Sequence, residues 1–135
     1  LLRQIPGDKL ICAFIDSNFI TDQSVFIARF ENDEKNPAGV LGIINSKLLA
    51  FYFRNKYSEF DDLFPKVKLQ HFKDFPIRTS PELVFNEIST IVSEIRSRKT
   101  SNPNFDSRKL EEEIDQLVYQ LYELTEEEIK IVEGK

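Results

Sequence analysis

The spacing of hydrophobic and polar positions differs between the two halves of the chain. In the first half, short apolar runs at residues 10–15 and 25–30 are separated by polar stretches, which is typical of strands joined by turns. The polar residues 31–39 then predict a loop. These elements indicate a small mixed α/β domain in the first part of the chain.

Apolar side chains become denser over residues 40–53, with Asn45 and Ser46 as a polar interruption. Ser46 can cap a helix whose buried face carries Leu48, Leu49, Tyr52 and Phe53. The piece before Ser46 is interpreted as helical, although its branched aliphatic residues would suit a strand equally well. Residues 64–76 contain two prolines and predict a short strand and a turn.

The second half has a helical period. Apolar residues recur at spacings of 4, 3 and 4 over residues 84–95 and again over 110–121, which predicts two amphipathic helices. Ser80 and Asp106 stand where caps are expected, and the short loop between the helices predicts an antiparallel hairpin. Thr125 and Glu128 form a capping box for a last short helix. The predicted class is α+β, with an α/β recognition domain at 1–79 and a helical hairpin at 80–135.

Length and composition are those of one ordinary globular domain. The 135 residues are 41% hydrophobic and 30% charged, and no apolar run reaches the roughly 18 residues that a membrane span needs. The single cysteine and single histidine exclude a disulfide framework and a zinc site built on them. We expect a cytoplasmic, metal-free protein. Because the chain lacks methionine, we also expect it to be a piece of a longer protein.

Charge is distributed unevenly. Residues 81–135 carry 7 Lys and Arg against 13 Asp and Glu, whereas residues 45–78 carry seven basic residues against four acidic ones. In that basic segment the cations alternate with aromatic residues. Such cations can neutralise phosphates, while the aromatics supply stacking or packing. The segment is therefore a candidate nucleic-acid surface, or else a small core with a basic rim.

Residues that could carry catalysis have simpler interpretations. Cys12 lies in an apolar run and is expected to be a buried, unreactive side chain. His71 lies among basic residues, which favours a surface or phosphate-contacting imidazole over a general base. Asp61 and Asp62 lack a third carboxylate at a spacing that would help to bind a metal. The sequence therefore offers no active site.

Three strings resemble a known family. They are LGIINSKLLAFYF at residues 41–53, FPKVK at 64–68 and FKDFPI at 72–77. They resemble the TaqI-like C-terminal specificity domain, the target recognition domain of type II restriction–modification enzymes, chiefly type IIG, with N6-adenine methyltransferase activity. Ile44, Val67 and Arg78 are mild departures from the family pattern. The tail at residues 114–129 also resembles the common ending of those enzymes.

The resemblance implies that DNA recognition and catalysis are carried out by different domains. A methyltransferase domain upstream would bind S-adenosylmethionine, and a nuclease, where present, would use Mg²⁺. This chain would hold double-stranded DNA, position the target adenine and carry no catalysis itself. The acidic hairpin, which DNA should repel, would brace the recognition domain or pack against the methyltransferase.

The resemblance also separates core positions from contact positions. The shared motif residues are expected in the core: Leu41, Ile44, Leu48, Phe53 and Phe64. The candidates for DNA phosphate contacts are Arg54, Lys56, Lys66, Lys68 and His71. The candidates for reading bases lie in loops and are Gln23, Ser24, Arg29, Asn32 and Asn36.

Two other functions compete with DNA recognition. The hairpin over residues 80–122 could be a protein-interaction module without DNA binding, and exposed apolar residues on its outer face would support that. A hydrolase that uses Cys12 and His71 is the second alternative.

Overall fold

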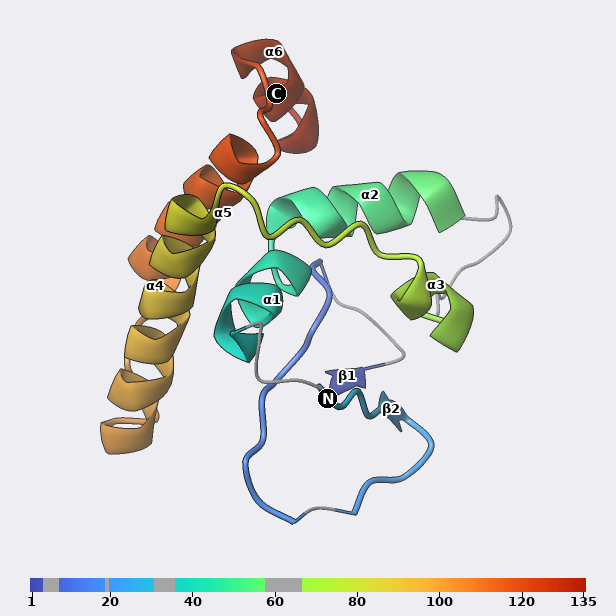
Figure 1. The fold of residues 1–135 in the computed structure, drawn as a ribbon, viewed down its shortest axis with the longest axis vertical. Coiled ribbons are helices and arrows are strands. Elements are labelled where there is room, and N and C mark those ends of the chain that lie inside the picture. Colours follow the sequence, from blue (N-terminus) through green and yellow to red (C-terminus); the bar gives the residue numbers. More distant parts are fainter. Residues whose placement is uncertain (4–7, 19, 31–35, 58–66) are drawn as a thin grey trace.

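The chain folds mainly into helices, as a computed structural model of residues 1–135 shows (Figure 1). The structure describes residues 1–3, 8–18, 20–30, 36–57 and 67–135. The elements are β1 (Leu2–Arg3), β2 (Val25–Phe26), α1 (Pro37–Ile44), α2 (Lys47–Tyr57), α3 (Leu69–Lys73), α4 (Glu82–Ser101), α5 (Arg108–Leu121) and α6 (Glu126–Val132). The α+β prediction is thus confirmed only in part, because helices dominate the described residues.

Strand pairing near the N-terminus is short. β1 and β2 run antiparallel, with Leu2 opposite Phe26, and Leu2 also forms an isolated bridge with Cys12. The predicted strand at residues 10–15 is therefore wrong, and the strand predicted at 25–30 is limited to its first two residues. The physical reason is that a ladder extends only as far as its partner, and β1 is two residues long.

α1 begins earlier than the sequence predicts. Asn36 is its N-cap and accepts a hydrogen bond from the Ala38 amide at 3.0 Å, while Pro37 occupies the first turn. A proline there costs nothing because its missing N–H would have no partner inside the helix. The predicted loop over 31–39 is wrong for its last three residues, and the helical interpretation of residues 40–44 is confirmed.

The sequence predicts a strand within residues 67–75, but the structure has a helix there. The predicted strand is replaced by the short helix α3, which lies between buried Val67 and Phe75. At its start, the Lys68 amide donates to Nδ1 of His71 at 3.1 Å. A side-chain acceptor for a first-turn amide favours a helical turn. Residues 64–66 of the predicted strand lie outside the described residues.

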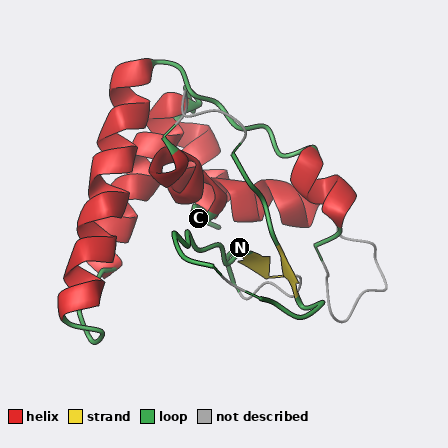
Figure 2. Ribbon diagram, turned by 60° about the horizontal axis from the view of Figure 1, so that its bottom comes forward, coloured by secondary structure: helices red, strands yellow, loops and turns green. Residues whose placement is uncertain are grey.

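α4 and α5 lie side by side and antiparallel, as predicted (Figures 1 and 2). The predicted caps differ in detail. α4 follows a cis Ser80–Pro81 bond without a side-chain cap, and the N-cap of α5 is Ser107. Asp106 instead accepts from the Arg108 amide at 3.1 Å. The capping box of α6 is confirmed, since Thr125 accepts from the Glu128 amide at 3.3 Å. Among the described residues, no helix is long and apolar enough to cross a membrane.

Two glycines let α1 approach α4 closely. A Cβ added to Gly39 would lie 2.4 Å from Cζ of Phe85, and one added to Gly42 would lie 2.5 Å from Cγ2 of Ile88. Both neighbours belong to one hydrophobic core that draws residues from both halves of the chain. The proposed division at residue 79 stays a prediction.

A polar junction ties α2 to the hairpin and to the N-terminal segment. The Asn45 side chain clasps the backbone of Cys12, accepting from its N–H at 2.8 Å and donating to its C=O at 2.9 Å. Ser46 caps α2, as predicted, by accepting from the Leu49 amide at 3.2 Å. The amide of Lys47, the residue after Ser46, donates to the buried Asp115 on α5 at 2.8 Å. Asn45, Ser46 and Lys47 therefore connect the N-terminal segment, α2 and the hairpin.

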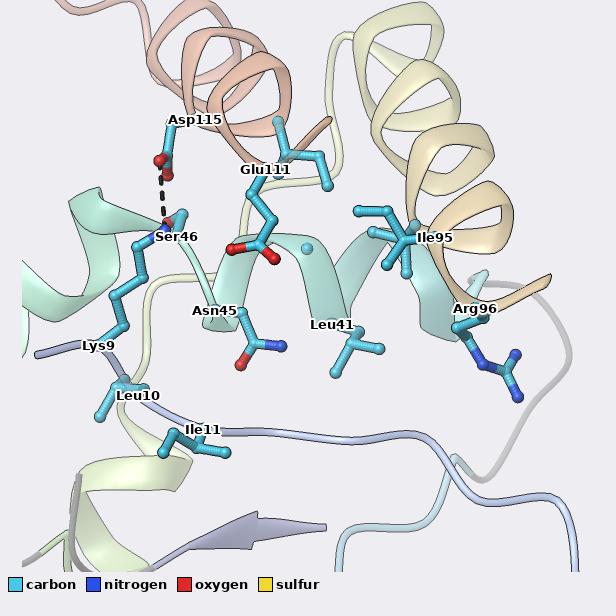
Figure 3. Close-up of a pocket in the computed structure, with 13 residues that line it drawn as sticks. Lys9, Leu10, Ile11, Leu41, Asn45, Ser46, Ile95, Arg96, Glu111 and Asp115 are labelled. Atoms are coloured by element: carbon cyan, nitrogen blue, oxygen red, sulfur yellow. Dashed lines mark hydrogen bonds and ion pairs between the residues drawn. The ribbon is translucent and has the colours of Figure 1, made fainter. Parts of the chain in front are cut away.

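The same junction borders a cavity of about 310 Å³ between the N-terminal segment, α1, α4 and α5 (Figure 3). In this view Lys9 reaches towards Asp115, and the two side chains form an ion pair of 3.4 Å. The motif residues behave largely as expected. Ile44 and Phe53 are buried, and Leu41 and Leu48 are half-buried against the core. Phe64 lies outside the described residues.

Candidate nucleic-acid interface

The C-terminal end of α2 and the short helix α3 build an aromatic platform. The rings of Tyr57 and His71 stack with centroids 4.0 Å apart and an interplanar angle of 23°. Phe53 supports the stack from the core, with its centroid 5.6 Å from that of His71. Residues from two helices are therefore held in one fixed cluster, on the side of the molecule away from the hairpin (Figures 1 and 2).

Cations lie on the two helices of this platform or at their ends. Arg54, Lys56, Lys68 and Lys73 are all exposed. Nζ of Lys56 donates to the Tyr52 hydroxyl at 2.6 Å and lies 5.4 Å from the Tyr57 ring centroid. The hydrogen bond to Tyr52 is the main reason that the pKa of Lys56 is raised, so this side chain stays charged at neutral pH. One guanidinium nitrogen of Arg54 donates to the Asp8 carbonyl at 3.1 Å.

Three of the base-reading candidates, Gln23, Ser24 and Arg29, flank β2 in the sequence. The Ser24 amide donates to Oδ1 of Asp22 at 2.9 Å, and the Ser24 hydroxyl donates to the same oxygen. The hydroxyl bond is the main cause of the lowered pKa of Asp22. The hydroxyl proton of Ser24 is thus engaged within the turn, while the neighbouring Gln23 and the more distant Arg29 are exposed.

Asn36 has a role that the sequence interpretation missed. Its side-chain oxygen caps α1, so the NH₂ group is the part left to meet a ligand. An asparagine that directly precedes a proline and an apolar run is a recognisable cap signal. Asn32 and Lys66, the remaining candidates, lie outside the described residues.

The family comparison agrees with these features. Residues 1–77 match the model of the TaqI-like C-terminal specificity domain, which is more than half of the chain. The chain belongs to this family. It is a specificity domain of the kind found in methyltransferase-related restriction–modification proteins. No curated protein and no solved structure matches the chain.

The match covers α1, α2 and α3 of the specificity domain, including every phosphate and base candidate. The resemblance of the first half is therefore confirmed. The resemblance of the tail at residues 114–129 lies beyond the matched range and stays a prediction. The roles of the individual site residues also stay predictions.

The catalytic alternatives gain no support from the geometry of the specificity domain. Burial is the main cause of the raised pKa of the half-buried Cys12 thiol, which disfavours the nucleophilic thiolate. The described residues contain no group of three or more His, Cys, Asp or Glu side chains that could hold a metal ion. Asp61 and Asp62 lie outside the described residues.

The structure also shows what the sequence analysis overlooked. Lys73 belongs to the basic segment 45–78 without being a site candidate, and the structure places it, exposed, at the end of α3. Tyr57 is one of the aromatic residues of segment 45–78, but its stacking partner is 14 residues away in sequence. The alternation of basic and aromatic residues carried the signal, but the pairing depends on how α2 and α3 meet.

Proposed function

We propose that this specificity domain binds double-stranded DNA and positions the target adenine for an N6-adenine methyltransferase domain. The observation that carries the proposal is the stack of Tyr57 on His71 with exposed cations on the same two helices, in a chain of this family. Lys and Arg spaced along such a surface neutralise phosphates whatever the sequence. Arg54, Lys56, Lys68 and His71, together with Lys66, would then hold the duplex.

Sequence would be read elsewhere. Gln23, Ser24, Arg29, Asn32 and Asn36 supply the amide, hydroxyl and guanidinium groups that pair with base edges in the major groove. A turn held by Asp22 presents Gln23 and Ser24 away from the core. Phosphate contacts fix the register of the domain on DNA, and base contacts select the site.

The methyl donor would be bound by another part of the parent protein. The chain has no Asn-Pro-Pro-Tyr-type motif, and the described residues contain no group of three or more His, Cys, Asp or Glu side chains that could hold a metal ion. If a nuclease is present in the parent, it would hold the Mg²⁺. The 135-residue chain mixed with S-adenosylmethionine and DNA should therefore transfer no methyl group.

Salt dependence of DNA binding tests the proposal. The chain should bind a labelled duplex with a dissociation constant of about 10⁻⁴ to 10⁻⁶ M at physiological salt, measured by fluorescence anisotropy. Lys56→Gln and Lys68→Gln should each make the negative slope of log K against log salt shallower by about 0.9, because each removes one phosphate contact.

A matched control is Lys109→Gln, which removes the same charge from the exposed face of α5. It should leave the slope unchanged because α5 is not part of the interface. Equal slopes for all three variants and the unmodified chain, or no binding at low salt, would contradict the proposal.

The structure offers little support for the alternative that the hairpin is a protein-interaction module. Among the residues of α4 and α5, all of which are described, Leu83 is the one large apolar side chain that is strongly exposed. The criterion for that alternative was a surplus of such residues on the outer face of the hairpin.

A further inference from the structure

The hairpin is acidic as a whole, but its tip is basic. The tip, residues 96–105, is the end of α4 and the start of the loop to α5, and it contains Arg96, Arg98 and Lys99 but no Asp or Glu. All three cations are exposed. The family match ends at residue 77 and therefore assigns nothing to the tip.

The carboxylates that flank the tip in the sequence are already engaged. Glu94 forms an ion pair of 2.6 Å with Arg98. On the other side, Asp106 forms an ion pair of 2.6 Å with Arg108, which also donates to both of its oxygens. Arg98 and Arg108 are thus compensated within the hairpin.

Arg96 and Lys99 are the cations that remain. Neither forms an ion pair with another described residue, and they share one face of α4 because they are three residues apart. The guanidinium of Arg96 lies 4.6 Å from the ring centroid of Phe14, and Figure 3 shows it directed away from Glu111. A guanidinium that stacks on a ring still presents N–H donors at its edge, in the geometry that a phosphate requires.

The contact with Phe14 places the tip against the N-terminal segment. Figures 1 and 2 both show the C-terminal end of α4 and the short helix α3 on opposite sides of this segment. Between them lie the exposed residues 16–18 and the base-reading candidates Gln23 and Ser24. Phosphate contacts on both sides of a reading segment would fix the register of a duplex more firmly than contacts on one side.

Other acidic residues of the hairpin lie away from Arg96. Glu87 and Glu113 line a hollow with Ile91 and Leu117, whereas Arg96 borders the cavity next to α1. Nine residues of helix, about 14 Å, separate Glu87 from Arg96. That exceeds the Debye length of about 8 Å at physiological salt, so repulsion of a phosphate at the tip is largely screened.

We propose that Arg96 and Lys99 bind the phosphate backbone of the same DNA duplex that α2 and α3 hold. The domain then grips the duplex on both sides of its reading segment. This inference rests on the proposed DNA binding and extends the interface to the hairpin, where the overall charge predicts repulsion. An acidic protein segment would carry the same charge, but only a duplex also passes the reading segment and the cations of α2 and α3.

Lys99→Gln is the cleanest test because the Lys99 side chain is exposed and unpaired among the described residues. In fluorescence anisotropy with a labelled duplex, Lys99→Gln should make the negative slope of log K against log salt shallower by about 0.9. The double variant that adds Arg96→Gln should change the slope by about twice as much. Lys109→Gln is the matched control, because Lys109 shares the exposed face of α5 with Glu112 and Glu113, and it should leave the slope unchanged.

Two measurements separate a phosphate contact from a structural role. Arg96→Lys keeps the charge and can still face the Phe14 ring, so it should retain most of the slope. Lys99→Gln should leave the free energy of unfolding in urea unchanged while it alters the slope. Duplex DNA added to ¹⁵N-labelled protein should shift the amide resonances of residues 96–101 in a saturable manner.

Three results would overturn the contact at the tip and leave DNA recognition intact. The first is a shallower slope for Lys56→Gln and Lys68→Gln with no change for Lys99→Gln and the double variant. The second is an equal change for Lys109→Gln, which would indicate a general effect of charge. The third is polyglutamate, and not duplex DNA, shifting the amides of residues 96–101, which would assign the tip to an acidic protein segment. Absence of any DNA binding at low salt would overturn both proposals together.

Discussion

Two parts of the molecule, the N-terminal segment (residues 8–18 and 20–30) and the α4–α5 hairpin, keep their shapes by different means. The N-terminal segment is held at few points, chiefly the Asn45 clasp on Cys12 and the two-residue pairing of β2, and its Ile20 side chain is 96% exposed. In the hairpin, by contrast, Ile88, Val118 and Leu121 are completely buried. The N-terminal segment is attached to the rest of the protein at a few contacts, whereas the hairpin is packed along its whole length.

The difference matches what each region is proposed to do. Loops that read a ligand need exposed polar groups and freedom to adjust, and they are drawn from the less stable parts of a protein. A packed hairpin can hold such loops at a fixed position. We therefore expect amides of residues 13–24 to exchange with solvent faster than those of α4 and α5.

The largest expected effect comes from forcing α1 away from the packed hairpin. Gly42→Ala places a methyl group 2.5 Å from Cγ2 of Ile88, which is completely buried and cannot move aside. We expect a loss of about 1–3 kcal/mol in the free energy of unfolding, measured by urea denaturation. The control Thr90→Ala, on the exposed face of α4, should cost much less. Equal effects of the two substitutions would mean that α1 does not pack tightly on α4.

The next effect comes from cutting the polar link between α2 and α5. Asp115→Ala removes the acceptor of the Lys47 amide and the partner of Lys9, and should cost about 2 kcal/mol. Asp115→Asn keeps an acceptor and should cost less. Hydrogen exchange at the Lys47 amide is the direct measurement. If that amide stays protected in Asp115→Ala, the link does not stabilise α2.

The same junction shows where sequence reasoning succeeds and where it stops. The hairpin and the Ser46 cap could be predicted because their signals lie within a few residues. Asp115 could not be assigned, because its partner is 68 residues away. A carboxylate beside Ile114 on the buried face of an amphipathic helix was a signal that something would satisfy it, but not what.

The first half was harder to predict for a related reason. Apolar runs at residues 10–15 and 25–30 suggest strands, but a strand exists only where a partner lies beside it. The sequence does not predict α3, because a helix of five residues is too short to show a helical spacing of apolar residues. The candidate interface was found by its composition, whereas the stacking of Tyr57 on His71 required the tertiary arrangement.

A smaller effect should stay within the C-terminal part. Thr125→Ala removes the N-cap side chain of α6 and should cost about 1 kcal/mol, seen as faster exchange of the α6 amides. Ser101→Ala, at the exposed end of α4, is the control. Exchange that also rises in residues 8–30 would show that the two regions are more strongly coupled than their packing indicates.

The smallest effect is a change in one titration. The hydrogen bond from the Arg108 side chain is the main reason that the pKa of Asp106 falls from 3.8 to about 2. Because the folded value is lowered, the stabilising effect is present above the ordinary pKa and is lost as the pH falls towards 2. Arg108→Gln should return the pKa towards its ordinary value in a ¹³C NMR titration. An unchanged pKa would mean that the pair does not persist in solution.

The Asn45 clasp has a consequence for how recognition can diversify. Cys12 is fixed by this side chain and β2 is fixed by β1, so the residues between them form a closed span with both ends anchored to the protein. Doubling the length of such a span costs only about 0.6 kcal/mol in closure entropy. Beyond Phe14, whose ring centroid lies 4.6 Å from the Arg96 guanidinium on α4, insertions, deletions and substitutions in this span can accumulate during evolution, or be grafted between relatives, with little effect on the helices. A new DNA site could thus be acquired by exchanging roughly a dozen residues of this span.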